Sequence, residues 1–430
     1  MEKRTENWYR LDNAGVLYSA LQKEKYSAIY RFSAVMQAPV DPAALQRAID
    51  KTMPRFPCFA VRIKKGLFWY YLEPNTAPGP FLKQDILYPC QPIRFREDNG
   101  WLIRFYYYEQ RISLEVFHAL SDGAGSLTFF KTLLAVYLRE LGYVIPNDAG
   151  VLDISAPPDP EELEDAYARY AGPVDRAIRL RRRAYPNTGT AEPFYTLHVT
   201  MGFAAVDQLK VRARAYDATI TEYLTAVLMQ VILERQRRER PRRPKPVALV
   251  IPVNLRPLFP SKTLRNFVTT LSPAIDPALG DYSFEEIIQQ VRHYLRLHVN
   301  RPELRAAFTH NVRFQRNWFL KIVPVAIKNP VMAAVYRRVG TKPYSGNYSN
   351  PGRFSVPEEM EPHIRHMEVV VGQATVPRSH CVSLSYGNIM EITFAGTQRE
   401  NSTARDFFRF LVRDGVHVKV QSNDTGERRE

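Results

Sequence analysis

The stretch RISLEVFHALSDGAG, at residues 111–125, predicts a strand, a tight turn and the start of a helix. Ile112, Leu114, Val116 and His118 alternate with polar residues, so His118 lies on the apolar face, at the last position of the strand. Residues 126–141 carry apolar side chains at helical spacing, and a glycine at 142 follows as a stop signal. The order strand, turn, helix indicates an α/β unit that holds His118 at a strand end.

The turn also supplies candidate functional residues. A neutral imidazole at a buried strand end can accept a proton from a hydroxyl, an amine or a thiol near pH 7. Asp122 either pairs with an arginine and fixes the turn, or orients the imidazole. Gly123 permits tight backbone geometry and leaves room for a substrate. The spacing alone also fits a core histidine with satisfied hydrogen bonds, so it does not decide the function.

Strand-like and helical segments alternate on both sides of this unit. Residues 144–193 interrupt them with proline, acidic and basic blocks, which predict a linker. We expect a first lobe at 1–190 and a second at 191–430, each a mixed β-sheet with flanking helices. The predicted strands are 28–35, 59–63, 67–72, 101–108, 194–202, 247–253, 382–384 and 389–394, and the predicted helices are 41–53, 203–215, 222–235, 284–298 and 403–413.

The charge of the chain favours anionic partners. The formal net charge is +15 over 430 residues, and 45% of the residues are hydrophobic, which excludes a disordered chain. The basic block at 235–245 is either a solvated loop or a contact for CoA phosphates or an acidic carrier protein. We expect no nucleic-acid partner, because stacking aromatics do not accompany the block. The basic and aromatic stretch at 301–342 forms either helices that cover the lobe or a peripheral contact with an anionic membrane.

Other patterns bear on the compartment and the chemistry. Three scattered cysteines give no disulfide framework, and no secretion signal or long apolar run is present, so we expect a cytoplasmic protein. His363 and His366 lack the further ligands of a metal site. We therefore expect no metal and no nucleotide hydrolysis.

His118-x-x-x-Asp122-Gly123 resembles the HxxxDG signature of the acyltransferase superfamily that includes chloramphenicol acetyltransferase, plant BAHD enzymes, condensation domains and alcohol acetyltransferases. The DFGWG motif of the BAHD branch is absent, and Phe117 replaces the first of the two histidines usual in condensation domains. Further segments resemble alcohol acetyltransferase-like members across nearly the whole chain: Trp8–Ala14, Arg55–Pro57, Ile251–Pro257 with Asn266–Phe267, and Ser349–Gly352.

The resemblance implies two lobes with a channel between them and His118 at its middle. It implies transfer of an acyl group from acyl-CoA, a co-substrate, to an alcohol or amine, with His118 as the general base and Asp122 as a structural support through an arginine. No permanently bound cofactor is expected. Candidate oxyanion or acceptor contacts are Ser349, Asn350 and Ser385, and the candidate CoA phosphate contact is Arg256.

Three alternatives stay open at this point. The donor could be a thioester on an acyl carrier protein instead of free CoA. The chain could be a catalytically silent binding or scaffold protein that keeps the fold. The net charge could instead serve a nucleic-acid or membrane-surface binder. We expect a monomer in each case.

Overall fold

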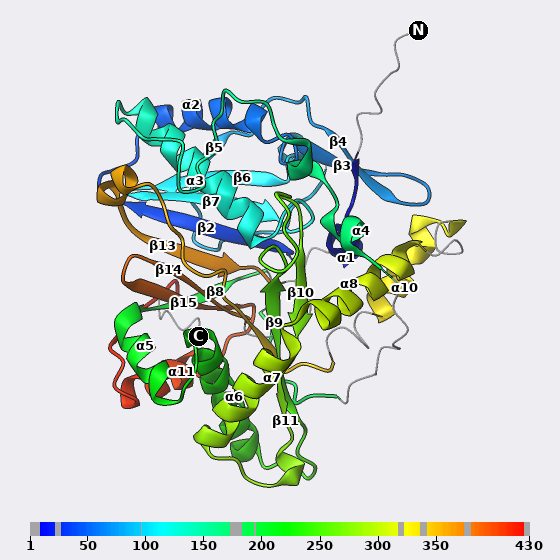
Figure 1. Ribbon diagram of the computed structural model, residues 1–430, viewed down its shortest axis with the longest axis vertical. Coiled ribbons are helices and arrows are strands. Elements are labelled where there is room, and N and C mark those ends of the chain that lie inside the picture. Colours follow the sequence, from blue (N-terminus) through cyan, green and yellow to red (C-terminus); the bar gives the residue numbers. More distant parts are fainter. Residues whose placement is uncertain are drawn as a thin grey trace.

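The computed structural model describes residues 9–21, 27–95, 97–172, 183–192, 195–316, 322–335, 342–373 and 380–424 (Figure 1). Sequence predictions on Trp8, Phe194 and the basic and aromatic residues at 317–321 and 336–341 lie outside these ranges. Helices and mixed sheets occur in both halves of the chain, as predicted. The described helices are α1 (Asn13–Leu21), α2 (Pro42–Thr52), α3 (Gly123–Glu140), α4 (Ala166–Tyr170), α5 (Val206–Ala215), α6 (Ile220–Glu239), α7 (Phe284–His298), α8 (Arg301–Arg316), α10 (Val325–Val335) and α11 (Ser402–Arg413).

The strand that leads to His118 lies in the middle of a sheet that has the order β13-β2-β7-β6-β5 among the described residues. Helices α2 and α3 pack together and cover one face of this sheet (Figure 1). Helix α2 begins where predicted, because Asp41 accepts hydrogen bonds from the first two free amides and Pro42 fits the first turn. The strands are β2 (Ile29–Met36), β5 (Leu82–Gln84), β6 (Ile103–Tyr108), β7 (Arg111–Phe117) and β13 (Ile364–Val371).

The second large sheet has the order β10-β9-β12-β14-β15-β8-β16 among the described residues, with β11 paired to β9. Strands β14 and β15 form the predicted hairpin, in which Tyr386 pairs with Ile389. The strands of this sheet are β8 (His198–Ala205), β9 (Val247–Asn254), β10 (Val268–Leu271), β11 (Ala274–Ile275), β12 (Gly346–Ser349), β14 (His380–Tyr386), β15 (Ile389–Gly396) and β16 (Val418–Ser422). A small sheet holds β1 (Tyr9–Arg10), β4 (Tyr70–Pro74) and β3 (Val61–Lys65).

Strand β13 belongs by sequence to the second half but pairs along its length with β2 of the first. Its other contacts include β14 and β15, so β13 is packed between the two large sheets. The lobe boundary near residue 190 stays a prediction. The sheets nevertheless show that the second half donates a strand to the first, which binds the two halves together.

Strand β7 alternates between apolar and polar side chains as predicted, and from Ile112 to Phe117 its side chains are buried on both faces. The apolar side chains of β7 lie in the same buried core as those of α3. On the other face Glu115 accepts from Arg31 at 3.0 Å and 2.7 Å, and Ser113 bonds Ser33 at 2.9 Å. Charged residues can be buried on such a face because they pair with one another.

Candidate active site

His118 directly follows β7, one residue beyond the end of the strand. Its backbone amide donates to the carbonyl of Ala28 at 2.8 Å, which continues the pairing with β2. The imidazole stacks on Tyr18 of α1, with ring centroids 4.5 Å apart, and meets the edge of Tyr30 at 4.9 Å. The residue as a whole keeps partial exposure. The ring is therefore held on two sides while the residue remains accessible.

Asn266 fixes the tautomer of His118. The Nδ2 group of Asn266 donates to the His118 carbonyl at 2.9 Å and to the Asp12 carboxylate at 3.1 Å. Because both of these partners are acceptors, the other amide atom must be the oxygen. That Oδ1 lies 3.1 Å from His118 Nδ1, so Nδ1 carries the proton. The arrangement leaves Nε2 with its lone pair, as a general base requires.

Asp12 supports Asn266 from a fully buried position. Its Oδ1 accepts from the backbone amide of Gly15 at 2.7 Å, and Arg265 lies at 3.9 Å from its Oδ2. Burial raises the pKa of Asp12 to about 6, against the opposing effect of Arg265. A carboxyl oxygen of Asp12 therefore accepts the hydrogen bond from the Asn266 amide, and Asn266 in turn orients the imidazole.

Burial lowers the pKa of His118 below its ordinary value, and the nearby carboxylate of Asp122 opposes this shift only in part. The imidazole lies against the rings of Tyr18 and Tyr30, which displace water and so disfavour the charged form. A lowered pKa keeps the imidazole neutral at pH 7. The group is thus ready to accept a proton without first losing one.

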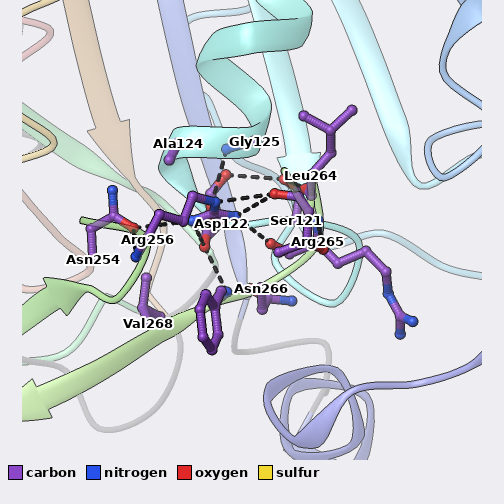
Figure 2. A network of polar contacts seen from close by, with 12 residues as sticks. Ser121, Asp122, Ala124, Gly125, Asn254, Arg256, Leu264, Arg265, Asn266 and Val268 are labelled. Atoms are coloured by element: carbon purple, nitrogen blue, oxygen red, sulfur yellow. Dashed lines mark hydrogen bonds and ion pairs between the residues drawn. The ribbon is translucent and has the colours of Figure 1, made fainter. Parts of the chain in front are cut away.

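Asp122 is a structural residue in this geometry and is almost completely buried (Figure 2). It caps α3, where its Oδ1 accepts from the amide of Gly125 at 3.0 Å. Its Oδ2 accepts from Arg256 at 2.8 Å and from the amide of Phe267 at 2.7 Å. The carboxylate therefore joins the His118 turn to the loop after β9, and it matches the predicted support through an arginine.

The glycines of the turn have different surroundings. A Cβ on Gly125 would lie 2.1 Å from the carbonyl oxygen of Leu264, so only glycine lets that loop approach α3. Ser121 Oγ donates to the same carbonyl at 2.5 Å (Figure 2). A Cβ on Gly123 would meet nothing closer than 3.7 Å, to Phe32 and Pro351. Gly123 therefore lies where the His118 turn faces the turn at 349–352.

The guanidinium group of Arg256 is fully occupied by hydrogen bonds within the protein. Its guanidinium donates to Asp122, Asn254 and the carbonyls of Thr263 and Arg265, which uses all of its N–H groups. The predicted contact of Arg256 with a CoA phosphate thus gains no support here, because no donor remains for a ligand.

The candidate oxyanion contacts lie on the second half of the chain. Asn350 donates to Thr221 at 3.0 Å and accepts from the amide of Gly352 at 2.9 Å. Ser385 Oγ donates to the Gly352 carbonyl at 3.3 Å. Ser349 ends β12 and is half-buried. Two of the three candidates are therefore engaged in holding the turn.

Sequence reasoning did not assign a role to Asp12 or Asn266. Both lie in segments that carry the family resemblance, which was the only available signal. Their function depends on a contact between residues 254 positions apart, and no local pattern indicates such a contact.

A basic cavity of about 560 Å³ lies near this site. Its lining residues include Arg169, Arg301, Arg305, Tyr170 and Phe259. Both rings pack on Phe267, the residue after Asn266. One layer of aromatic side chains therefore separates the cavity from the residues that hold His118.

Several solved structures share this architecture. Polyketide synthase associated protein 5 from Mycobacterium tuberculosis matches with a TM-score of 0.62 at 15% identity, over 94% of this chain and 96% of that chain. The TRI3 trichothecene 15-O-acetyltransferase from Fusarium sporotrichioides matches with 0.61 at 10% identity, over 95% and 94%. A mutant starter condensation domain of rhizomide synthetase, in complex with C8-CoA and Leu-SNAC, matches with 0.59 at 12% identity, over 94% of both chains.

These likenesses confirm the predicted two-lobed fold of the chloramphenicol acetyltransferase and condensation-domain kind. No protein-family model matches the sequence, and no curated protein matches it either. At such low identities the comparison establishes the fold and leaves the reaction to be argued from the site.

Proposed function

We propose that this protein transfers an acyl group from a thioester to a hydroxyl or amine, with His118 as the general base. The observation that carries the proposal is the 3.1 Å contact between His118 Nδ1 and Asn266 Oδ1. Asn266 accepts the Nδ1 proton, so the lone pair of Nε2 is available. The fold neighbours include an acetyltransferase and a condensation domain, which supports the proposal of an acyl-transfer reaction.

The reaction balances with the acceptor and the thioester alone. His118 Nε2 takes the proton of the acceptor while the acceptor's oxygen or nitrogen attacks the thioester carbonyl. The tetrahedral intermediate then collapses, the C–S bond breaks, and the thiolate leaves with the proton that the imidazolium returns. The new ester or amide and a free thiol are the products.

We retain Ser349 as the candidate oxyanion donor. The Asn350 amide and the Ser385 hydroxyl already bond within the turn at 349–352, so a ligand would have to displace those bonds. A hydroxyl that stabilises the oxyanion contributes most where water is excluded. Ser349 lies on the turn whose Pro351 faces Gly123.

The basic cavity favours CoA as the donor over a carrier protein. Arg301 and Arg305 suit phosphates, whereas Arg169 is already paired with Glu161 and Glu164, and the rings of Tyr170 and Phe259 suit a stacked base. Free CoA carries several phosphate charges and an adenine, whereas a carrier-bound thioester carries one phosphodiester and no adenine. The mutant rhizomide synthetase domain was solved in complex with C8-CoA, which supports the choice of an acyl-CoA donor.

Thiol release from acyl-CoA tests the reaction. We expect acceptor-dependent release when acetyl-CoA or a longer acyl-CoA is supplied with a panel of alcohols and amines. Release from carrier-loaded thioesters alone would assign the donor to the carrier protein. No release with any donor would support the silent-scaffold alternative and contradict the proposal.

The cavity is tested by removing charge. We expect the Arg301→Ala and Arg305→Ala double variant to raise KM for acyl-CoA about tenfold, as lost charge-assisted contacts would. The same acyl group on N-acetylcysteamine, which has no phosphate, serves as the matched substrate and should turn over unchanged. An equal rise in KM for both substrates would remove the phosphate role from this cavity.

A further inference from the structure

We propose that the face formed by α10 and the β3–β4 hairpin docks on the surface of an anionic lipid membrane. This inference concerns binding and does not depend on the proposed reaction. Figure 1 shows the hairpin and α10 on the same side of the molecule. The backbone joins them, because the amide of Val325 donates to the carbonyl of Leu67 at 2.9 Å.

Helix α10 turns its polar residues inward and its apolar residues outward. Lys328 Nζ donates to the carbonyl of Phe68 at 2.7 Å, and Asn329 donates to the hydroxyl of Tyr70 at 2.7 Å. The exposed positions are Ala326, Ile327, Pro330, Val331 and Ala334, which share one face at helical spacing. An exposed helix face of a soluble protein normally shows the opposite pattern.

The hairpin continues this apolar face. The amide of Gly66 donates to the carbonyl of Trp69 at 2.9 Å, which closes a tight turn with Leu67 at its tip. Leu67 is 69% exposed and Trp69 is 50% exposed, and on α10 Ile327 is 58% and Val331 is 57% exposed. Turn tips are ordinarily polar. A contiguous exposed apolar surface indicates a contact with another apolar phase.

The net charge of the chain favours an anionic membrane, and not a second copy of the chain, as the partner of this face. Two copies that each carry a formal charge of +15 repel one another, whereas an anionic bilayer attracts the chain. Lys65 is exposed on β3 beside the tip, where it can reach lipid phosphates. Tryptophan at the edge of the patch suits the interfacial region. Among the described residues no helix is long and apolar enough to cross a bilayer, so α10 would lie on its surface.

The position of the face suits delivery of an apolar molecule toward the site. Helix α10 packs on α1, and Tyr18 of α1 stacks on His118. One helix therefore lies between the proposed membrane contact and the imidazole.

Vesicle flotation of the full chain tests the inference. We expect binding to phosphatidylcholine vesicles that contain phosphatidylglycerol, weaker binding to phosphatidylcholine alone, and weaker binding as salt screens the charge. The Ile327→Ser and Val331→Ser double variant should bind about 10- to 100-fold more weakly, from the lost burial of two apolar side chains. Both residues are exposed, so the thermal unfolding midpoint should not change.

Leu279→Ser is the matched control, because Leu279 is an exposed apolar residue that belongs neither to α10 nor to the β3–β4 hairpin. It lies in the segment before α7. This variant should bind the vesicles with the same affinity as the parent protein. Absence of binding by the parent protein, or equal loss in the control, would overturn the inference. A dimer of the parent protein that dissociates in the double variant would also overturn it, because the face would then belong to a second copy.

Discussion

At the scale of single residues, His118, Asn266 and Asp12 form a chain of hydrogen bonds that sets which ring nitrogen is basic. The three residues come from the end of β7, the loop before β10 and the start of α1. Asn266 and Asp12 act through His118 and are positioning residues in the proposed reaction. Substitutions at these two positions should therefore change the behaviour of the imidazole more than the binding of substrate.

Asn266→Leu removes the acceptor for the Nδ1 proton, so the tautomer with a protonated Nε2 becomes available. We expect kcat to fall about 10- to 100-fold, as when other orienting groups are lost. The Asn266 bond also raises the pKa of His118, so its loss should move the acid limb of the pH–rate profile to lower pH.

Asn187→Leu is the control for Asn266→Leu, because Asn187 is equally buried but bonds Arg235 instead of the histidine. It should lose stability without moving the acid limb. An unmoved limb in Asn266→Leu would contradict the positioning role.

Asp12 should make stability depend on pH. Its pKa is about 6 in the folded chain against an ordinary 3.8, so the folded state holds the proton more strongly. Stability is then greatest below the ordinary value and falls as pH rises from about 4 to about 6, by about 3 kcal/mol at most. Asp12→Asn, compared with the parent protein by chemical denaturation at both ends of this range, should remove that part of the slope. A slope that stays unchanged would show that the Asp12 carboxyl does not titrate in this window.

At the scale of elements, the N-terminus of α3 packs closely against the loop that contains Leu264. Gly125→Ala would place a methyl group 2.1 Å from the Leu264 carbonyl, so we expect a loss of about 3 kcal/mol in the free energy of unfolding. Gly123→Ala is the matched variant, with 3.7 Å of space, and should change stability by less than about 1 kcal/mol. Equal effects in denaturant titrations of the two variants would contradict this packing.

The sequence predicted most elements that depend on local pattern. Helix α7 at Phe284–His298 has the predicted bounds, with Ser283 and Glu286 forming a capping box. Strand β13 was missed, because its partner β2 lies more than 300 residues earlier. The residues 203–205 were read as helix but extend β8, because Phe203 and Ala204 pair with β15 and β16. Long-range pairing decided both cases.

At the scale of the whole molecule, Asp122 ties the His118 turn to the second half of the chain. Asp122→Asn would leave Arg256 without its carboxylate in a mostly buried place, so we expect a loss of about 3 kcal/mol. The exposed pair of Asp159 and Lys262 provides the control, and Asp159→Asn should have little effect on the unfolding midpoint. Unchanged folding with abolished turnover in Asp122→Asn would contradict its structural role.

The family resemblance supplied the prediction of the two-lobed fold, which the fold comparisons confirm. The composition gave only the net charge of the chain. Which partner that charge attracts depends on where the charged residues lie on the folded protein. Arg256 was chosen from sequence for a phosphate, but the structure commits it to Asp122 and shows Arg301 and Arg305 around the nearby cavity instead. Such choices require the three-dimensional arrangement, because a guanidinium looks the same in sequence whether or not its donors are used.

The most direct test of the account is acceptor-dependent thiol release by the parent protein and by His118→Ala. We predict that the variant stays folded and loses turnover about 10²- to 10⁴-fold, the usual contribution of a general base. Equal turnover in the two proteins would contradict the assignment of His118 as the base and, with it, the proposed mechanism.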